Sequence, residues 1–274
     1  MPWFDASDGA RLFYRDSGTG PVLVCLHGLT RNSRDFNRLV PLVPGLRIIA
    51  PDARGRGLSA QTGAASYTVA RESEDVVNLL DHLGIAAAAF LGSSRGGMVT
   101  MALAARAPAR ILGLCLNDIG PEMEPAGRMR ITTYVGLHPP EPGIEARVAA
   151  MPAHHPGFAN VPEARWREEV RHHFIETPEG LRLTYDPALR DAFMATLDRA
   201  PDMWPGFDAL AGRPVAVIRG ANSDILSPGI VAGMARRRPD LIRAEVPDRG
   251  HMPFLDEPAS LAALRRWLAA AAPS

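Results

Sequence analysis

Residues 92–96 read Gly-Ser-Ser-Arg-Gly, a G-x-S-x-G pattern that lies between two segments of different periodicity. The apolar run before it, residues 86–91, predicts a short buried strand, and the segment after it predicts a helix that Pro108 ends. A strand that turns directly into a helix leaves the middle residue, Ser94, on a tight and strained corner at the carboxyl end of a sheet. The rest of the chain must be arranged around this corner.

The two glycines identify Ser94, and not Ser93, as the corner residue. The positions two before and two after Ser94 are both glycine. Centred on Ser93, the same positions would hold Leu91 and Arg95, whose Cβ atoms would crowd the turn. The helix N-terminus under Ser94 offers unpaired N–H groups and a positive dipole end, which suit an oxyanion. Because so short a pattern also occurs by chance, its meaning depends on partner residues elsewhere in the chain.

The composition excludes several classes of partner. The formal net charge of the 274 residues is zero, so the chain lacks the basic excess that binds nucleic acid. All thirty basic residues are arginine, which excludes Schiff-base catalysis by lysine and the phosphate-binding lysine of a P-loop. We expect a small-molecule substrate, no nucleic-acid partner and no cofactor. The sequence leaves homodimer formation open.

The cysteines and the N-terminal residues predict a cytoplasmic protein. Cys25 and Cys115 lie in separate strand-like runs and are predicted to be buried, reduced thiols instead of a disulfide or a metal site. The first residues include Asp5 and Arg11 where a signal peptide would be apolar, so we expect no signal peptide. We find no stretch that approaches the length of a membrane span, and expect no membrane association.

Strands and helices alternate along most of the chain, which predicts a parallel, doubly wound sheet. Residues 1–17 predict an N-terminal hairpin. The other predicted strands are short apolar runs at residues 22–26, 46–50, 86–91, 111–116, 214–219 and 242–246. A hydrophobic content of 46% in 274 residues supports one large core with room for an insertion.

The alternation stops between residues 121 and 207. This segment is rich in proline and predicts helices near residues 163–174 and 189–197, but no convincing strand. We therefore predict a helical cap at residues 121–207 over a core that is formed by residues 1–120 and 208–274.

Five of the eight histidines lie in this predicted cap, and two adjacent pairs raise a metal site as an alternative. The pairs are His154-His155 and His172-His173. Neighbouring residues on a helix point about 100° apart and rarely share one ion, so we predict solvated helix faces and no metal.

Three side chains of complementary chemistry follow three predicted strands. Ser94, Asp224 and His251 each come just after the carboxyl end of a strand, and so lie at one edge of one sheet. A serine hydroxyl needs an imidazole to take its proton, and the imidazole needs a carboxylate on its other nitrogen. We predict Ser94 as the nucleophile, His251 as the base and Asp224 as the acid. Asp118, which follows another strand, is the alternative acid, because such groups are recognised by geometry.

Two backbone N–H groups are predicted to stabilise an oxyanion at Ser94. One belongs to Arg95, and the other to Leu29, whose loop directly follows a predicted central strand and lies at the same sheet edge. His27, in the same loop, is predicted to brace the loop by hydrogen bonds instead of acting as a base.

Taken together, these motifs resemble the α/β-hydrolase superfamily. The resemblance rests on His27-Gly28, Asp52–Ser59, Gly92–Gly96, Asp224 and Gly250-His251. It implies a mostly parallel, eight-stranded sheet flanked by helices, with a helical cap insertion. Within the superfamily the chain is similar to capped esterases, enol-lactonases and carbon–carbon bond hydrolases. It departs from dehalogenases and epoxide hydrolases, which carry aspartate at the nucleophile position.

We predict a serine hydrolase that cleaves a small, largely uncharged carboxylic ester or lactone through an acyl-enzyme. The predicted pocket walls are apolar groups near strand ends or in the cap, namely Ile119, Tyr134, Trp204 and Met252, together with Leu29.

Two alternatives stay open. A carbon–carbon bond hydrolase of the meta-cleavage-product type would use the same triad on a vinylogous diketo acid. The carboxylate of that substrate requires an arginine in the pocket, and the cap offers Arg128, Arg130, Arg182 and Arg190. The third function is a ligand receptor on a hydrolase scaffold, against which the intact set of nucleophile, base and acid argues.

Overall fold

The computed structural model describes residues 2–198 and 201–271. Its main sheet has eight strands in the order β1-β2-β4-β3-β5-β6-β9-β10. The pairs β1–β2 and β2–β4 are antiparallel, and the pairs from β4 to β10 are parallel. The strands are β1 Trp3–Asp5, β2 Arg11–Ser17, β3 Val22–Leu26, β4 Arg47–Pro51, β5 Ala88–Ser93, β6 Ile111–Asn117, β9 Val215–Gly220 and β10 Ile242–Val246. The predicted mostly parallel, eight-stranded sheet is confirmed.

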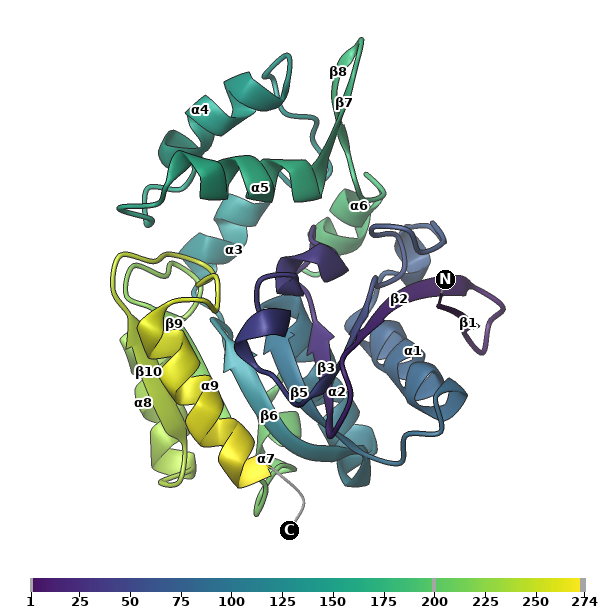
Figure 1. Ribbon diagram of the computed structural model, residues 1–274, viewed down its shortest axis with the longest axis vertical. Coiled ribbons are helices and arrows are strands. Elements are labelled where there is room, and N and C mark those ends of the chain that lie inside the picture. The colour runs from purple at the N-terminus through teal and green to yellow at the C-terminus, as the bar shows by residue number, and fades with distance from the viewer. Residues whose placement is uncertain (1, 199–200, 272–274) are drawn as a thin grey trace.

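Helices cover both faces of this sheet (Figure 1). On one face lie α1 Val69–His82, α2 Arg95–Arg106, α7 Trp204–Asp208 and α8 Pro228–Arg237. On the other lie α9 Pro258–Ala271 and the short 3-10 helix η1 Ser33–Phe36. Three further 3-10 turns are η2 Val40–Leu42, η3 Ala64–Ser66 and η4 Pro108–Arg110.

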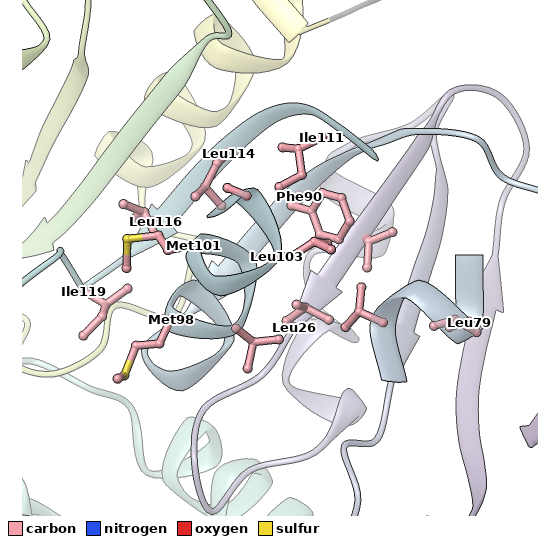
Figure 2. Packing of buried hydrophobic residues seen from close by; sticks show 14 of the residues in the cluster. Leu26, Leu79, Phe90, Met98, Met101, Leu103, Ile111, Leu114, Leu116 and Ile119 are labelled. Carbon is pink, nitrogen blue, oxygen red and sulfur yellow. The ribbon is translucent and has the colours of Figure 1, made fainter. Parts of the chain in front are cut away.

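Burial on both faces explains why the central strands read as continuous apolar runs. In β3, Val24 and Leu26 face α1 and α2, whereas Leu23 and Cys25 face the layer that contains α9. Figure 2 shows the first of these two layers, in which side chains of α2 lie against those of β5 and β6. Cys25 and Cys115 are both buried and unpaired, as predicted, and burial raises the pKa of both thiols.

The turn between β5 and α2 has the predicted strained geometry. Ser94 adopts φ 49°, a left-handed conformation that non-glycine residues rarely take. A Cβ atom on Gly92 would lie 2.5 Å from the Gly97 Cα, and one on Gly96 would lie 2.1 Å from the Leu26 carbonyl oxygen. Both glycines of the motif are therefore required, because the helix backbone touches the ends of two strands.

The insertion between β6 and β9 forms a cap over one edge of the sheet (Figure 1). It contains α3 Pro125–Ile131, α4 Ile144–His154, α5 Glu163–His173 and α6 Leu189–Met194. It also contains a hairpin of two short strands, β7 Phe174–Thr177 and β8 Gly180–Leu183, which the sequence analysis did not predict. The cap has a small apolar core of its own, in which Trp166 and Val170 pack against α4.

Ion pairs join the cap to the core. Arg31, in the loop after β3, pairs with Glu169 of α5 at 2.6 Å and with Asp35 at 2.7 Å. His173 contacts Asp35 at 2.9 Å, and Arg165 pairs with Asp256 at 2.7 Å. These side chains are largely shielded from water, so the pairs are screened less than surface pairs and fix the position of α5.

Within the described residues, we find no helix that is both long enough and apolar enough to cross a bilayer.

The glycine requirement predicts a specific loss of stability. We expect Gly96→Ala to lower the free energy of unfolding by about 1–3 kcal/mol, because the new methyl group overlaps the Leu26 carbonyl oxygen. Gly229→Ala is the matched control, since its nearest neighbour would be a side-chain oxygen 3.7 Å away. Urea denaturation measures both, and equal stability of the two variants would contradict the prediction.

The cap also predicts a dependence of stability on pH. Burial, with a smaller contribution from Arg31, lowers the pKa of His155 to about 3, and its ring stacks on Trp166. An unfolded histidine titrates near pH 6.5, so below that pH only the unfolded chain binds this proton and stability falls. Through this residue, wild type is expected to lose about 2 kcal/mol of its free energy of unfolding between pH 7.5 and pH 5. We expect His155→Phe to lack this part of the loss. Denaturant titrations at both pH values measure it, and an unchanged loss would count against this account.

Candidate active site

Three residues from three strand ends form a chain of hydrogen bonds at the edge of the sheet below the cap. The Ser94 hydroxyl lies 2.8 Å from Nε2 of His251, and Nδ1 of His251 lies 2.7 Å from Oδ2 of Asp118. Ser94 stands at the corner after β5, Asp118 follows β6, and His251 lies in the loop after β10. This arrangement holds the imidazole with a proton on Nδ1 and a lone pair on Nε2 that faces the hydroxyl.

Asp118 is fully buried, and its carboxylate is fixed by donors on both oxygens. Oδ1 accepts from the backbone N–H of Gly220 at 2.7 Å. Oδ2 accepts from the Ser223 hydroxyl at 2.6 Å in addition to His251. A buried charge needs such compensation, and the bonds prevent the carboxylate from turning away from the imidazole.

The prediction that Asp224 orients His251 is wrong. Asp224 pairs in bidentate fashion with Arg130 of α3, and the second contact of this pair, from Nη2 to Oδ1, measures 3.0 Å. Burial raises the pKa of Asp224, but the Arg130 guanidinium outweighs it and holds the pKa below its usual value. The alternative acid, Asp118, occupies the position on the imidazole.

Arg95 and Leu29 supply backbone N–H groups that have no protein acceptor in the described part of the chain. The peptide that carries the Arg95 N–H also carries the Ser94 carbonyl, which accepts from Gly97 at 2.9 Å. In a trans peptide the N–H points opposite to the carbonyl, so this bond aims the Arg95 N–H away from the helix. The peptide that carries the Leu29 N–H also carries the Gly28 carbonyl, which accepts from the Arg31 N–H at 3.2 Å. This bond directs the Leu29 N–H away from the turn that residues 28–31 form.

His27 braces the loop after β3, as predicted. Its Nδ1 lies 2.8 Å from the Gly28 carbonyl oxygen, and its Nε2 accepts from the Ala53 N–H at 3.0 Å. These two bonds fix the tautomer with the proton on Nδ1. Burial lowers the pKa of His27, although Asp52 opposes the shift, and the ring is therefore a neutral brace.

Comparison with known proteins identifies the family. Residues 23–264 match the alpha/beta hydrolase family. The chain belongs to this family. It is 34% identical over 258 residues to a 3-hydroxybutyrate-oligomer hydrolase of Cupriavidus necator. This alignment covers 90% of this chain and 88% of the relative. It is 28% identical over 246 residues to a 2-(acetamidomethylene)succinate hydrolase of Mesorhizobium japonicum, at coverages of 86% and 84%.

Solved structures agree with this assignment. The crystal structure of an alpha/beta hydrolase from Novosphingobium aromaticivorans superposes with a TM-score of 0.91 at 37% identity, over 98% of this chain and 97% of the other. That of E-2-(acetamidomethylene)succinate hydrolase gives a TM-score of 0.84 at 25% identity, with 98% of each chain covered. The names of the relatives support hydrolase activity for this α/β-hydrolase.

Two of the predicted pocket walls are wrong. Ile119 of the α/β-hydrolase is fully buried in the core, where it packs beside Met98 and Gly97 of α2 (Figure 2). Trp204 lies in α7, which packs against α2 at the far end of the core, and its indole N–H donates to Glu122 (Figure 1). Apolar character near a strand end or in the insertion did not distinguish a pocket wall from a packed core residue.

Two other predicted pocket walls stay predictions. Tyr134 follows α3 in the cap and is 39% exposed, yet desolvation raises the pKa of its phenol to about 12. Met252 follows His251 directly and lies beside Gly28 of the Leu29 loop.

Among the described residues, the cap histidines of the α/β-hydrolase are not gathered into one group of metal-ligating side chains. In the described residues, the group of metal-ligating type is Asp35, Glu169 and His173. Arg31 already pairs with both carboxylates of this group, so it is an ion-pair network. The expectation that the paired histidines cover solvated helix faces is wrong for His173, which is 9% exposed.

The two candidate acids predict opposite results on mutation. Asp118→Asn removes the charge that stabilises the imidazolium and favours the wrong tautomer, so we expect kcat for ester hydrolysis to fall by about 10⁴-fold. Asp224→Asn leaves the His251–Asp118 contact intact, and kcat is expected to change by less than about tenfold. Steady-state kinetics on both variants measure this, and the reverse order of effects would restore Asp224 as the acid.

Proposed function

We propose that this α/β-hydrolase is a serine hydrolase that cleaves a small carboxylic ester or lactone through an acyl-enzyme. The observation that carries the proposal is the continuous chain from the Ser94 hydroxyl through His251 to Asp118, with contacts of 2.8 and 2.7 Å. The proposal assigns the oxyanion, the second requirement of acyl transfer, to the Leu29 and Arg95 N–H groups, which have no protein acceptor in the described residues.

In the proposed reaction, the Ser94 oxygen attacks the substrate carbonyl while Nε2 of His251 takes its proton. The negative charge that develops on the carbonyl oxygen is held by the two backbone N–H groups, each contributing on the order of 3 kcal/mol. Asp118 stabilises the imidazolium, which then protonates the leaving alkoxide. Water, activated by the same imidazole, hydrolyses the acyl-enzyme and restores Ser94.

The cap supports a substrate that carries a carboxylate. Arg130, on helix α3 of the cap, is 36% exposed and pairs with Asp224, which follows β9 at the sheet edge that also carries His251. The relatives named above act on a hydroxybutyrate oligomer and a substituted succinate, and molecules of both kinds carry carboxylates. We therefore propose a short hydroxyalkanoate oligomer as the first ester to test, with Arg130 at its acid end.

The same arginine supports a second candidate. A carbon–carbon bond hydrolase of the meta-cleavage-product type would also use Arg130 to bind a carboxylate and Ser94, His251 and Asp118 for cleavage. The two candidates differ in the bond that breaks, so turnover of a dienoate and of an ester by the same preparation separates them.

The test compares wild type with Ser94→Ala on p-nitrophenyl butyrate and on a 3-hydroxybutyrate dimer. We expect wild type to give a burst of acyl-enzyme followed by turnover, and Ser94→Ala to lose activity by about 10⁶-fold. Arg130→Gln is expected to raise KM for the dimer about tenfold or more and to leave KM for the uncharged ester nearly unchanged. Equal activity of Ser94→Ala and wild type would refute the proposal.

A further inference from the structure

We propose that Glu72 of α1 is a positioning residue for the oxyanion site, because it ties the loop that carries the Leu29 N–H to the corner that carries the Arg95 N–H. The connection runs through the guanidinium groups of Arg56 and Arg95, both of which bind the Glu72 carboxylate. This inference rests on the proposed function and adds to it a residue that does not touch the substrate.

The first arm of the connection is Arg56, which lies in the Gly-rich loop after β4 and is 1% exposed. Its Nε donates to the Leu29 carbonyl oxygen at 2.9 Å. Its Nη1 donates to Oε1 of Glu72 at 2.8 Å and to the Arg54 carbonyl oxygen at 2.6 Å. The buried guanidinium therefore joins the loop after β3 to helix α1.

The second arm is the side chain of Arg95, the residue that follows the candidate nucleophile. Its Nε donates to Oε2 of Glu72 at 2.7 Å, and its Nη2 donates to Oε1 at 2.9 Å. Nη2 also reaches the Tyr67 carbonyl oxygen at 2.7 Å. Both oxygens of the Glu72 carboxylate are thus occupied, and one of them is shared by the two arginines.

These contacts fix the direction of the Leu29 N–H from both sides. The peptide before Leu29 is held by His27 through the Gly28 carbonyl, and the peptide after it is held by Arg56 through the Leu29 carbonyl. With two successive peptide planes anchored, the N–H has little freedom to turn. A misplacement of about 1 Å in such a donor lowers the rate by about 10²-fold.

The charges of Glu72, Arg56 and Arg95 allow a positioning role of Glu72 to be distinguished from a purely electrostatic one. Burial raises the pKa of Glu72, but Arg56 and Arg95 outweigh it and lower the pKa to about 2, so the carboxylate is ionised at neutral pH. Two guanidinium groups against one carboxylate leave one positive charge behind the oxyanion site. Glu72→Gln would increase that positive charge while weakening the connection. Electrostatics alone would therefore raise kcat, whereas loss of position lowers it.

The experiment uses Glu72→Gln and Arg95→Met, and takes Arg110→Met as the control. Arg95→Met keeps the backbone N–H and removes only the side chain. Arg110 has comparable exposure, 22% against 14% for Arg95, and also pairs with α1, through Asp81, but contacts neither oxyanion segment. Each variant is assayed for kcat, KM, thermal midpoint, and affinity for an aryl trifluoromethyl ketone, which forms a tetrahedral adduct with the serine.

We expect Glu72→Gln and Arg95→Met to lower kcat by about 10- to 100-fold with KM nearly unchanged. Binding of the trifluoromethyl ketone is expected to weaken by the same factor, because the adduct uses the oxyanion site. Arg110→Met is expected to keep wild-type kcat and ketone affinity. Arg56→Lys keeps the charge but loses the bond to Leu29, and is expected to lower kcat and ketone affinity as Glu72→Gln does. It replaces Glu72→Gln in the test if that variant does not fold.

Two failures are distinguishable. If wild type does not hydrolyse any ester or lactone, the proposed function is wrong. If wild type is active, but Arg95→Met and Glu72→Gln (or Arg56→Lys) keep kcat and ketone affinity while their thermal midpoints fall, Glu72 is only a structural ion-pair partner and the inference is overturned.

Discussion

The contact between the N-terminus of helix α2 and the end of strand β3 brings two separate chain segments to one point. Gly96 touches the Leu26 carbonyl through its backbone, with no room for a side chain between them. The loop that carries Leu29 begins directly after Leu26, so the same contact joins this loop to the helix end that carries the Arg95 N–H. The candidate oxyanion site thus follows from the packing of a helix on a strand, and any displacement of α2 would separate its two donors.

The chain contains thirty arginines and no lysine, and the core around the site uses the planar geometry of the guanidinium group. Arg54 is fully buried and binds Asp75 through two nitrogens, at 2.7 and 2.6 Å. Arg56 binds a carboxylate and two backbone carbonyls at once. An ammonium group is a compact point charge and does not present donors in this fixed, forked geometry. The Arg56 guanidinium satisfies two loop carbonyls that would otherwise be buried without partners.

Sequence reasoning predicts the regular parts of this structure well. Ser94 and His251 can be predicted because their motifs are local. The strand positions follow from apolar runs that are buried on both faces of the sheet. The acid was misassigned because the choice depends on distance from the strand end. Asp118 comes directly after the last residue of β6, whereas Asp224 lies four residues beyond β9, at the cap. That difference in spacing is visible in the sequence and favours Asp118.

The cap hairpin and the pocket walls are not predictable from the sequence, for a different reason. Strand β7 has no fully buried residue, so its sequence lacks the alternation that reveals a strand in a large sheet. Apolar character alone predicts Ile119 and Trp204 as pocket walls. In a sheet that helices cover on both faces, however, most apolar side chains near strand ends belong to the core. The packing of Ile119 and of the α7 helix that begins at Trp204 depends on α2, which no local pattern relates to them.

Two carboxylates, Asp118 and Asp224, follow strands at this sheet edge, and they have different partners. Asp118 is buried, fixed by three hydrogen bonds and directed at Nδ1 of His251. Asp224 is 36% exposed, and both of its oxygens accept from Arg130 instead of from His251. Arg130 belongs to helix α3 of the cap, whereas Asp224 belongs to the core. The Arg130–Asp224 pair therefore joins the cap to the core at the same sheet edge as the candidate site.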